Sequence, residues 1–371
     1  MKQRFKKHVA LTLISLMLLS LIGCGKPAST DTTTTTEAAV TEAPAASISD
    51  AATTADSTPA DASEEDSDAQ TVYPVTVTDQ AGREVTIEKE PESIVSGYYI
   101  STSLLLALGL KDKVTGIEAK ASKRPIYKLA APKFLELPNV GTAKEFDLET
   151  CASLSPELVI LPMKLKDAAQ SLSELDIPVL LVNPESEAQL EQMIELVSTA
   201  TNTKENADAL LSYIDEKKEM LEKDLSGVDA KSVYLAGNSS LLSTAGPAMY
   251  QSGLIELAGG KNAASEITDT YWAEISYEQL LAWDPSYIIL ASDAEYTPED
   301  VLNDENLKEC TAVKNGNVYA IPGDIEALDS PVPGGILASI WLAGILHPDQ
   351  VSADMYTEEK AAFYETFYGI K

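Results

Sequence analysis

The chain has 371 residues, with 27 basic and 58 acidic side chains and a formal net charge of −31. This acid excess repels nucleic acid and anionic membrane surfaces, so we expect no nucleic-acid partner. Two histidines are too few for a histidine-rich metal site, and 44% apolar residues are enough for a sizeable core.

The N-terminus has the pattern of an export signal. Basic residues between Lys2 and Lys7 precede a mostly apolar run, Val9 to Ile22, which ends in Leu-Ile-Gly-Cys. Fourteen residues are too few for a membrane-spanning helix, which needs about 20, so residues 1–23 are predicted to be a cleaved signal peptide. The four residues ending at Cys24 resemble a bacterial lipobox, which implies lipidation of Cys24 and anchoring to the outer face of the cell membrane.

Residues 24–71 are predicted to be a disordered tether. This segment is rich in Thr, Ala and Ser, and from Gly25 to Thr71 it has ten acidic residues against one basic residue, Lys26. It has almost no large apolar side chain with which to offset the entropy of folding. Without the leader the chain would carry a net charge of about −35.

Residues 72–200 are predicted to form an α/β lobe. Two alternating runs around Gly82 predict a hairpin. Apolar runs then alternate with helical patterns, which is typical of a parallel sheet wrapped by helices. The predicted strands are 94–96, 114–117, 158–161 and 179–182, and the predicted helices are 102–108, 148–154, 166–175 and 187–199.

Residues 201–226 are predicted to form one long interlobe helix, because apolar side chains recur at helical spacing without Pro or Gly until Gly227. Residues 227–371 repeat the strand and helix alternation and predict a second α/β lobe. Its predicted strands are 232–236, 287–290 and 318–321, and its predicted helices are 249–257, 277–282, 336–346 and 358–367. The expected fold is α/β, with two mostly parallel sheets joined by one rigid helix.

One segment occurs in both lobes. Residues 146–161 align with residues 275–290 at a constant offset of 129, so that Glu149 matches Glu278 and Pro156 matches Pro285. In each copy a cap residue, Asp147 or Ser276, begins a short helix whose apolar stripe leaves the glutamate exposed. A glutamate in a first turn can simply offset the helix dipole, but two at matched positions favour a function.

These matched units resemble the cobalamin and ferric-siderophore binding proteins of bacterial ABC importers. The opening segment 77–87, the segment 106–116 and the segment 335–348 agree with that family. The resemblance implies a receptor without catalysis of its own, whose Glu149 and Glu278 dock onto arginines of a membrane permease served by a cytoplasmic ATPase. It also implies a metal chelate or a corrinoid as ligand, no cofactor and a monomer.

Ligands of open α/β sheets bind beyond the carboxyl ends of the strands, so the loops that follow the strands supply the candidate ligand residues. Residues 111–133 carry seven basic side chains in an acidic chain, and the Arg124 fork can hold a carboxylate or a catecholate. Aromatic side chains can form flat walls. The candidates are Tyr98, Tyr99, Lys123, Arg124, Tyr127, Lys164, Trp272 and Asp329.

Two alternatives stay open. A receptor for molybdate or tungstate needs only small polar donors in a tight cleft. A surface-anchored enzyme needs a nucleophile with a base or a cofactor motif, and the sequence contains no G-x-S-x-G, G-x-G-x-x-G or C-x-x-C. Cys151 and Cys310 are expected to be buried free thiols.

Overall fold

The computed structural model describes residues 70–268, 270 and 272–371, and all of them belong to one compact unit. The expected signal peptide, Cys24 and nearly all of the expected tether lie outside these residues. Thr71 is already tied to the fold, because its backbone N–H donates to Asn202 Oδ1 at 2.8 Å. None of the helices in the described part of the chain has the length and apolar character needed to cross a membrane.

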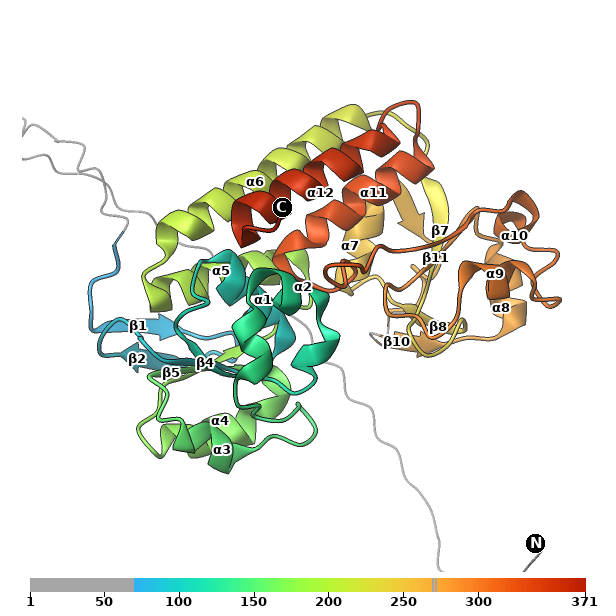
Figure 1. The fold of residues 1–371 in the computed structure, drawn as a ribbon. Helices are drawn as coiled ribbons and strands as arrows, with labels where there is room; N and C mark the ends of the chain where they lie inside the picture. The colour runs from blue at the N-terminus through green and yellow to red at the C-terminus, as the bar shows by residue number, and fades with distance from the viewer. Residues whose placement is uncertain (1–69, 269, 271) are drawn as a thin grey trace, which may run out of the picture. The chain divides into compact units, whose positions relative to one another are not determined.

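The first lobe is built on a four-stranded parallel sheet with the strand order β4-β3-β5-β6 (Figure 1). All residues of β5 and β6 are buried, as expected for a parallel sheet that helices cover on both faces. The strands are β3 (Ile94–Ser96), β4 (Val114–Ile117), β5 (Leu158–Pro162) and β6 (Val179–Val182).

A hairpin and several helices surround this sheet. The hairpin pairs β1 (Val75–Thr78) with β2 (Glu84–Ile87) in antiparallel register. Asp147 caps α3 by accepting a hydrogen bond from Thr150 N, and Ser186 caps α5 in the same way through Gln189 N. The helices are α1 (Tyr99–Ala107), α2 (Pro125–Ala130), α3 (Leu148–Ser153), α4 (Lys166–Ser173) and α5 (Glu187–Thr201).

A single helix, α6 (Lys204–Asp224), follows the first lobe and leads into the second. Its 21 residues give a rod of roughly 31 Å. It packs on α5 of the first lobe and on α7 and α11 of the second, as Figure 1 shows. The predicted interlobe helix is therefore present and contacts helices of both lobes.

The second lobe repeats the topology of the first. Its parallel sheet has the order β12-β11-β7-β9, so in each lobe the first strand along the chain lies between the second and the third. A short antiparallel ribbon pairs β8 (Ser243–Ala245) with β10 (Trp272–Glu274). The sheet strands are β7 (Lys231–Ala236), β9 (Gly260–Asn262), β11 (Tyr287–Leu290) and β12 (Val318–Ala320).

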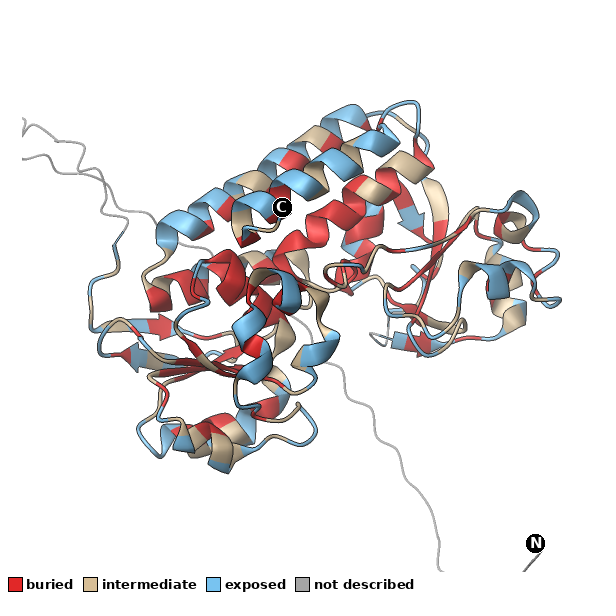
Figure 2. Ribbon diagram, in the orientation of Figure 1, coloured by how far each residue is buried: buried red, intermediate tan, exposed pale blue. Residues whose placement is uncertain are grey.

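The C-terminal helices join the two lobes a second time. In Figure 2, α11 is buried along most of its length, beside α6 and α12. One apolar core contains Leu104 of α1, Leu210 of α6, Ile340 of α11 and Phe363 of α12. The helices of this lobe are α7 (Tyr250–Leu257), α8 (Tyr277–Trp283), α9 (Pro298–Leu302), α10 (Thr311–Asn315), α11 (Ile336–Leu346) and α12 (Ala353–Tyr368).

The predicted fold class is confirmed, and the matched unit is visible in the element bounds. Helix α3 begins at Leu148 and α8 at Tyr277, and β5 begins at Leu158 and β11 at Tyr287, so both pairs differ by the offset of 129. Two helices are longer than predicted at their starts: α1 begins at Tyr99, and α12 begins after its cap Ser352. The short elements α2, α9, α10 and β8 to β10 were not predicted.

Candidate ligand-binding cleft

The loops that follow the first strand of each lobe meet at the candidate site. In a doubly wound sheet the first strand marks the point where the strand order reverses, and ligands bind in the crevice there. Tyr98 and Tyr99 follow β3 directly, and residues 237–239 follow β7. The two loops line one cavity, so the shared topology of the lobes positions both of its walls.

This interlobe cavity has a volume of about 450 Å³, within the range of about 300 to 1,000 Å³ that is usual for small-molecule sites. The first lobe contributes side chains from α1 and from the loop after β6. The second lobe contributes the loop after β7, the β8–β10 ribbon, α7 and the segment 329–331. The lining residues are Tyr98, Tyr99, Ile100, Glu185, Gly237, Asn238, Ser239, Ser243, Met249, Gln251, Trp272, Glu274, Asp329, Ser330 and Pro331.

Aromatic rings form two walls of the cavity. The rings of Tyr98 and Tyr99 meet edge to face, with centroids 5.4 Å apart. Trp272, on β10, keeps 39% of its surface exposed. A β carbon added to Gly237 would lie 3.1 Å from the Trp272 ring, so the glycine lets the indole pack against the loop after β7.

The polar floor comes mainly from the second lobe. Asp329 is buried and accepts a hydrogen bond from Ser292, and burial raises the pKa of its carboxyl. Gln251, 8% exposed, donates from Nε2 to the Asp329 carbonyl at 2.7 Å, while its Oε1 accepts no hydrogen bond from any described residue. The Tyr99 hydroxyl donates to Ser330 Oγ at 2.8 Å and so connects the lobes.

The charges of the cavity are negative. Glu185, Glu274 and Asp329 line it, and no lysine or arginine is among its described lining residues. Glu274 is exposed and Glu185 is half-buried. Neither of these two glutamates forms an ion pair with a described residue, so both carboxylates are available to a bound molecule.

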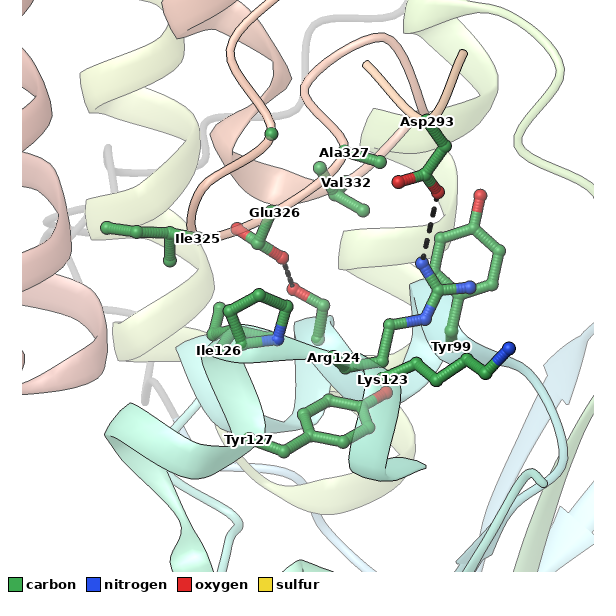
Figure 3. A pocket seen from close by; sticks show the side chains of 13 residues that line it. Tyr99, Lys123, Arg124, Ile126, Tyr127, Asp293, Ile325, Glu326, Ala327 and Val332 are labelled. Carbon is green, nitrogen blue, oxygen red and sulfur yellow. Dashed lines mark hydrogen bonds and ion pairs between the residues drawn. The ribbon is translucent and has the colours of Figure 1, made fainter. Parts of the chain in front are cut away.

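Two of the predicted basic residues, Lys123 and Arg124, lie at a second, smaller void beside Tyr99 (Figure 3). Its volume of about 30 Å³ leaves room for only about two water molecules. The Arg124 guanidinium lies 4.1 Å from the centre of the Tyr99 ring, and its Nη1 is 3.9 Å from Oδ2 of Asp293 in the second lobe. Lys123 and Tyr127 also line this void.

Two buried carboxyls lie near this void: Glu326 is part of its lining, and Glu118 is bonded to the lining residue Tyr127. The Tyr127 hydroxyl donates to Glu118 Oε1 at 2.6 Å, and burial raises the pKa of both groups. Glu326 accepts a hydrogen bond from Ser103 of α1, and the Tyr364 hydroxyl lies 3.2 Å from its Oε2. Burial raises the pKa of Glu326 to about 7. These contacts fix α2 and the segment after β12 against α1 and α12.

Four of the predicted ligand residues line one cavity, namely Tyr98, Tyr99, Trp272 and Asp329. Lys123, Arg124 and Tyr127 are grouped at the smaller void, and Lys164 is exposed and lines neither space.

The lining residues that sequence reasoning missed include the charged or amide side chains of Glu274, Gln251 and Glu185. Glu274 was detectable, because it lies two residues after Trp272 on a strand and therefore on the same face. Gln251 and Glu185 gave no signal in the sequence, since distant loops bring them to the site.

The matched glutamates lie in equivalent local structures. Glu149 and Glu278 are exposed, each in the first turn of its helix, α3 or α8. The backbone N–H of Glu278 and the Ser276 hydroxyl hold the pKa of the Glu278 carboxyl below its usual range. Ser276 accepts a hydrogen bond from Gln279 N and so caps α8, as predicted.

Cys151 and Cys310 are buried free thiols, and burial raises the pKa of both. Within the described part of the chain, no three side chains of His, Cys, Asp or Glu form a group suited to a bare metal ion.

Two α/β lobes of equal topology, with a ligand-sized cavity between them, define the class of two-lobed solute-binding proteins. Residues 94–325, more than half of the chain, match the sequence profile of a periplasmic binding protein family, and the chain belongs to that family. ABC transporter substrate-binding proteins are among its relatives.

Three relatives illustrate the range of the family. An uncharacterized ABC transporter substrate-binding lipoprotein of Bacillus subtilis, YvrC, is 28% identical over 73% of this chain and 86% of its own. The molybdate-binding protein MolA of Haemophilus influenzae is 24% identical over 79% and 90% of the two chains. A cobalamin-binding protein of Halobacterium salinarum is 22% identical over 77% and 78%.

The fold of MolA agrees with the fold described above. Its structure with bound molybdate covers 80% of this chain and 98% of its own, with a TM-score of 0.71 and 22% identity. At that identity the likeness concerns the fold.

Proposed function

We propose that this protein is an extracytoplasmic receptor that captures a metal chelate or a corrinoid between its lobes and delivers it to an ABC permease. The chelate is a ferric siderophore or a related iron complex. The observation that carries the proposal is the interlobe cavity of about 450 Å³, with walls formed by Tyr98, Tyr99 and Trp272. Aromatic faces bury the flat apolar surface of a macrocycle or a chelate and fix its orientation.

Delivery to the permease depends on the two matched glutamates and on the lipid anchor. Glu149 and Glu278 are exposed at matched positions, where each carboxylate would meet an arginine cluster of the permease. Lipidation of Cys24 would hold the receptor at the outer face of the membrane that contains the permease. Two separated contacts set the orientation of the receptor over the translocation path.

A receptor for molybdate or tungstate is the second candidate. The relative MolA and the small polar groups Asn238, Ser239 and Ser243 favour it. Its weakness is size: a cavity of about 450 Å³ has the volume of roughly 15 water molecules, and a five-atom oxyanion fills only a small part of it. A surface-anchored enzyme is the third candidate and requires turnover of a bound ligand.

Calorimetric titration of the purified receptor with ferric chelates, aquocobalamin, cyanocobalamin and molybdate tests the proposal. We expect saturable one-to-one binding of a chelate or a corrinoid, with recovery of the unchanged ligand after denaturation. Binding of molybdate alone would favour the second candidate, and release of a chemically altered ligand would favour the enzyme. Absence of binding by the whole panel would overturn the proposal.

A further inference from the structure

We propose that the interlobe cavity selects neutral or positively charged complexes and discriminates against polyanionic ones. This inference rests on the proposed function and narrows its ligand class. It differs from the expectation drawn from the basic residues of the sequence, in which Lys123 and Arg124 hold an anionic chelate.

The first argument is the set of charges that a bound molecule would meet. Glu185 and Glu274 contribute two carboxylates without ion-pair partners among the described residues, and Asp329 adds a third carboxyl, whose pKa is raised by burial. The described lining of the cavity contains no cationic side chain. Bringing a polyanion next to these carboxylates costs both Coulomb repulsion and the desolvation of the charges.

The second argument is that the nearest guanidinium group is already engaged. The Arg124 guanidinium contacts the Tyr99 ring on one side and Asp293 on the other. If movement of the lobes joined the two spaces, Lys123 and Arg124 would face Asp293 and Glu326 in addition to the three acidic groups of the cavity. Carboxylic groups would still outnumber cations by five to two.

The N-terminus of α1 is the main opposing feature. Tyr98 is the residue before this helix, and Tyr99 and Ile100 of its first turn line the cavity. A helix N-terminus is equivalent to about half a positive charge. The N-terminus of α7 also lines the cavity, through its cap Met249 and Gln251 of its first turn. The two partial charges together, about one unit, are smaller than the two carboxylates of Glu185 and Glu274, so the cavity remains negative.

A third argument concerns hydrogen bonding. Gln251, nine-tenths buried at the edge of the cavity, has a carbonyl oxygen that accepts no hydrogen bond from a described residue. Because that oxygen is itself buried, the acceptors open to a ligand are the carboxylates of Glu185 and Glu274, and acceptors bind N–H and O–H donors. Amide and ammonium groups on the rim of a chelate or a corrinoid supply such donors, whereas a bare oxyanion supplies none.

The inference divides the ferric chelates by chemistry. A hydroxamate group carries one negative charge, so a tris-hydroxamate complex of Fe³⁺ is neutral and becomes a cation when it carries a free ammonium group. A catecholate group carries two negative charges, so the tris-catecholate complex is a trianion. Among corrinoids, aquocobalamin carries one positive charge more than cyanocobalamin. The two cobalamins separate charge from shape, because they differ only in one axial ligand.

The test is a competitive calorimetric titration of the full chain with the tris-hydroxamate, the tris-catecholate, the two cobalamins and molybdate. We expect the tightest ligand to be neutral or cationic and the trianion to bind at least about tenfold more weakly than the best ferric complex. Tighter binding of the trianion or of molybdate would overturn the inference and leave a receptor function in place. Absence of all binding would overturn the proposed function, and the inference with it.

Two variants test whether the carboxylates of the cavity cause the preference against the trianion. In Glu185→Gln/Glu274→Gln both carboxylates are replaced by neutral groups of similar shape, and we expect the preference against the trianion to shrink by at least about tenfold. Glu256→Gln, at an exposed position on α7 outside the cavity, is the matched control and should keep the full preference. An unchanged preference in the double variant would overturn the assignment of charge selection to this cavity.

Discussion

Arg124 of the first lobe lies with Nη1 3.9 Å from Oδ2 of Asp293 in the second lobe. The same guanidinium stacks on Tyr99, whose hydroxyl donates to Ser330 across the cleft. The residue with the greatest expected affinity for an anionic ligand is therefore part of a contact between the lobes. This contact lies beside the larger cavity.

Replacing Lys123 and Arg124 together with alanine tests this assignment. The sequence alone predicted a loss of at least a few kcal/mol in the free energy of binding to an anionic chelate. The geometry predicts a loss below about 1.4 kcal/mol for a neutral ferric complex, because the Arg124 guanidinium is engaged with Tyr99 and Asp293. Calorimetric affinity is the readout, and a loss of several kcal/mol would return both side chains to the ligand.

Trp272→Ala should weaken ligand binding by roughly 1 to 3 kcal/mol, because the exposed face of the indole is available to be buried by the ligand. Trp272→Phe should recover much of the loss. Trp283→Phe is the control, since this indole lies on α8 and donates to Glu266 away from the cavity. If Trp272→Ala binds like the unmodified receptor, Trp272 does not form a wall of the site.

Stability should depend on pH through Glu326. Burial raises its pKa from 4.5 to about 7, so between these values the folded state retains a proton that the unfolded chain has lost. The free energy of unfolding therefore falls as the pH rises through this window, by on the order of 3 kcal/mol. Glu326 faces Ser103, Tyr364, Tyr368 and Arg124.

Urea unfolding of the unmodified receptor and of Glu326→Gln measures this contribution. The amide cannot titrate, so the variant should gain stability relative to the unmodified receptor as the pH rises from about 4.5 to 7. Subtracting the two curves removes the contributions of the other buried carboxyls. A difference that is independent of pH would show that Glu326 has an ordinary pKa.

Replacing the matched glutamates should abolish delivery of the ligand to the permease without changing capture of the ligand. Glu149→Arg/Glu278→Arg should bind ligand normally and fold normally, since both side chains are exposed and away from the cavity lining. Transport should fail, because the new charges would repel arginines of the permease by several kcal/mol. Each single change should already impair transport.

The control for this pair is Glu205→Arg, at an exposed position in the first turn of α6. Uptake of labelled ligand by proteoliposomes with the cognate permease is the readout. Normal uptake by the double variant would contradict the docking role, and loss of ligand binding would place these glutamates near the ligand.

The sequence predicted the architecture because the core signals are local. The strands 94–96, 114–117 and 179–182 and the helix 336–346 have the predicted bounds, since each is an apolar segment, interrupted only by Ser, Thr or Gly, between polar or turn residues. The ribbon of β8 and β10 was missed because three-residue strands are too short to show alternation. Its pairing depends on contacts between segments about 30 residues apart.

The site could be predicted only in part. Tyr98 and Tyr99 follow a predicted strand directly, so strand topology was enough to place them at the cleft. Arg124 follows β4 by seven residues, and its position depends on a contact between Ile126 N and Ile325 O in the other lobe. Gln251 reaches the cavity through the carbonyl of Asp329, 78 residues away. Such long-range contacts have no local signature.

The most direct test is a crystal structure of the receptor with the tightest ligand of the titration panel. The account predicts that the ligand lies between the lobes in contact with Tyr98, Tyr99 and Trp272, with Glu185 or Glu274 near its neutral or positive groups. A ligand found outside the cleft, or held by Lys123 and Arg124 away from these aromatic side chains, would contradict it.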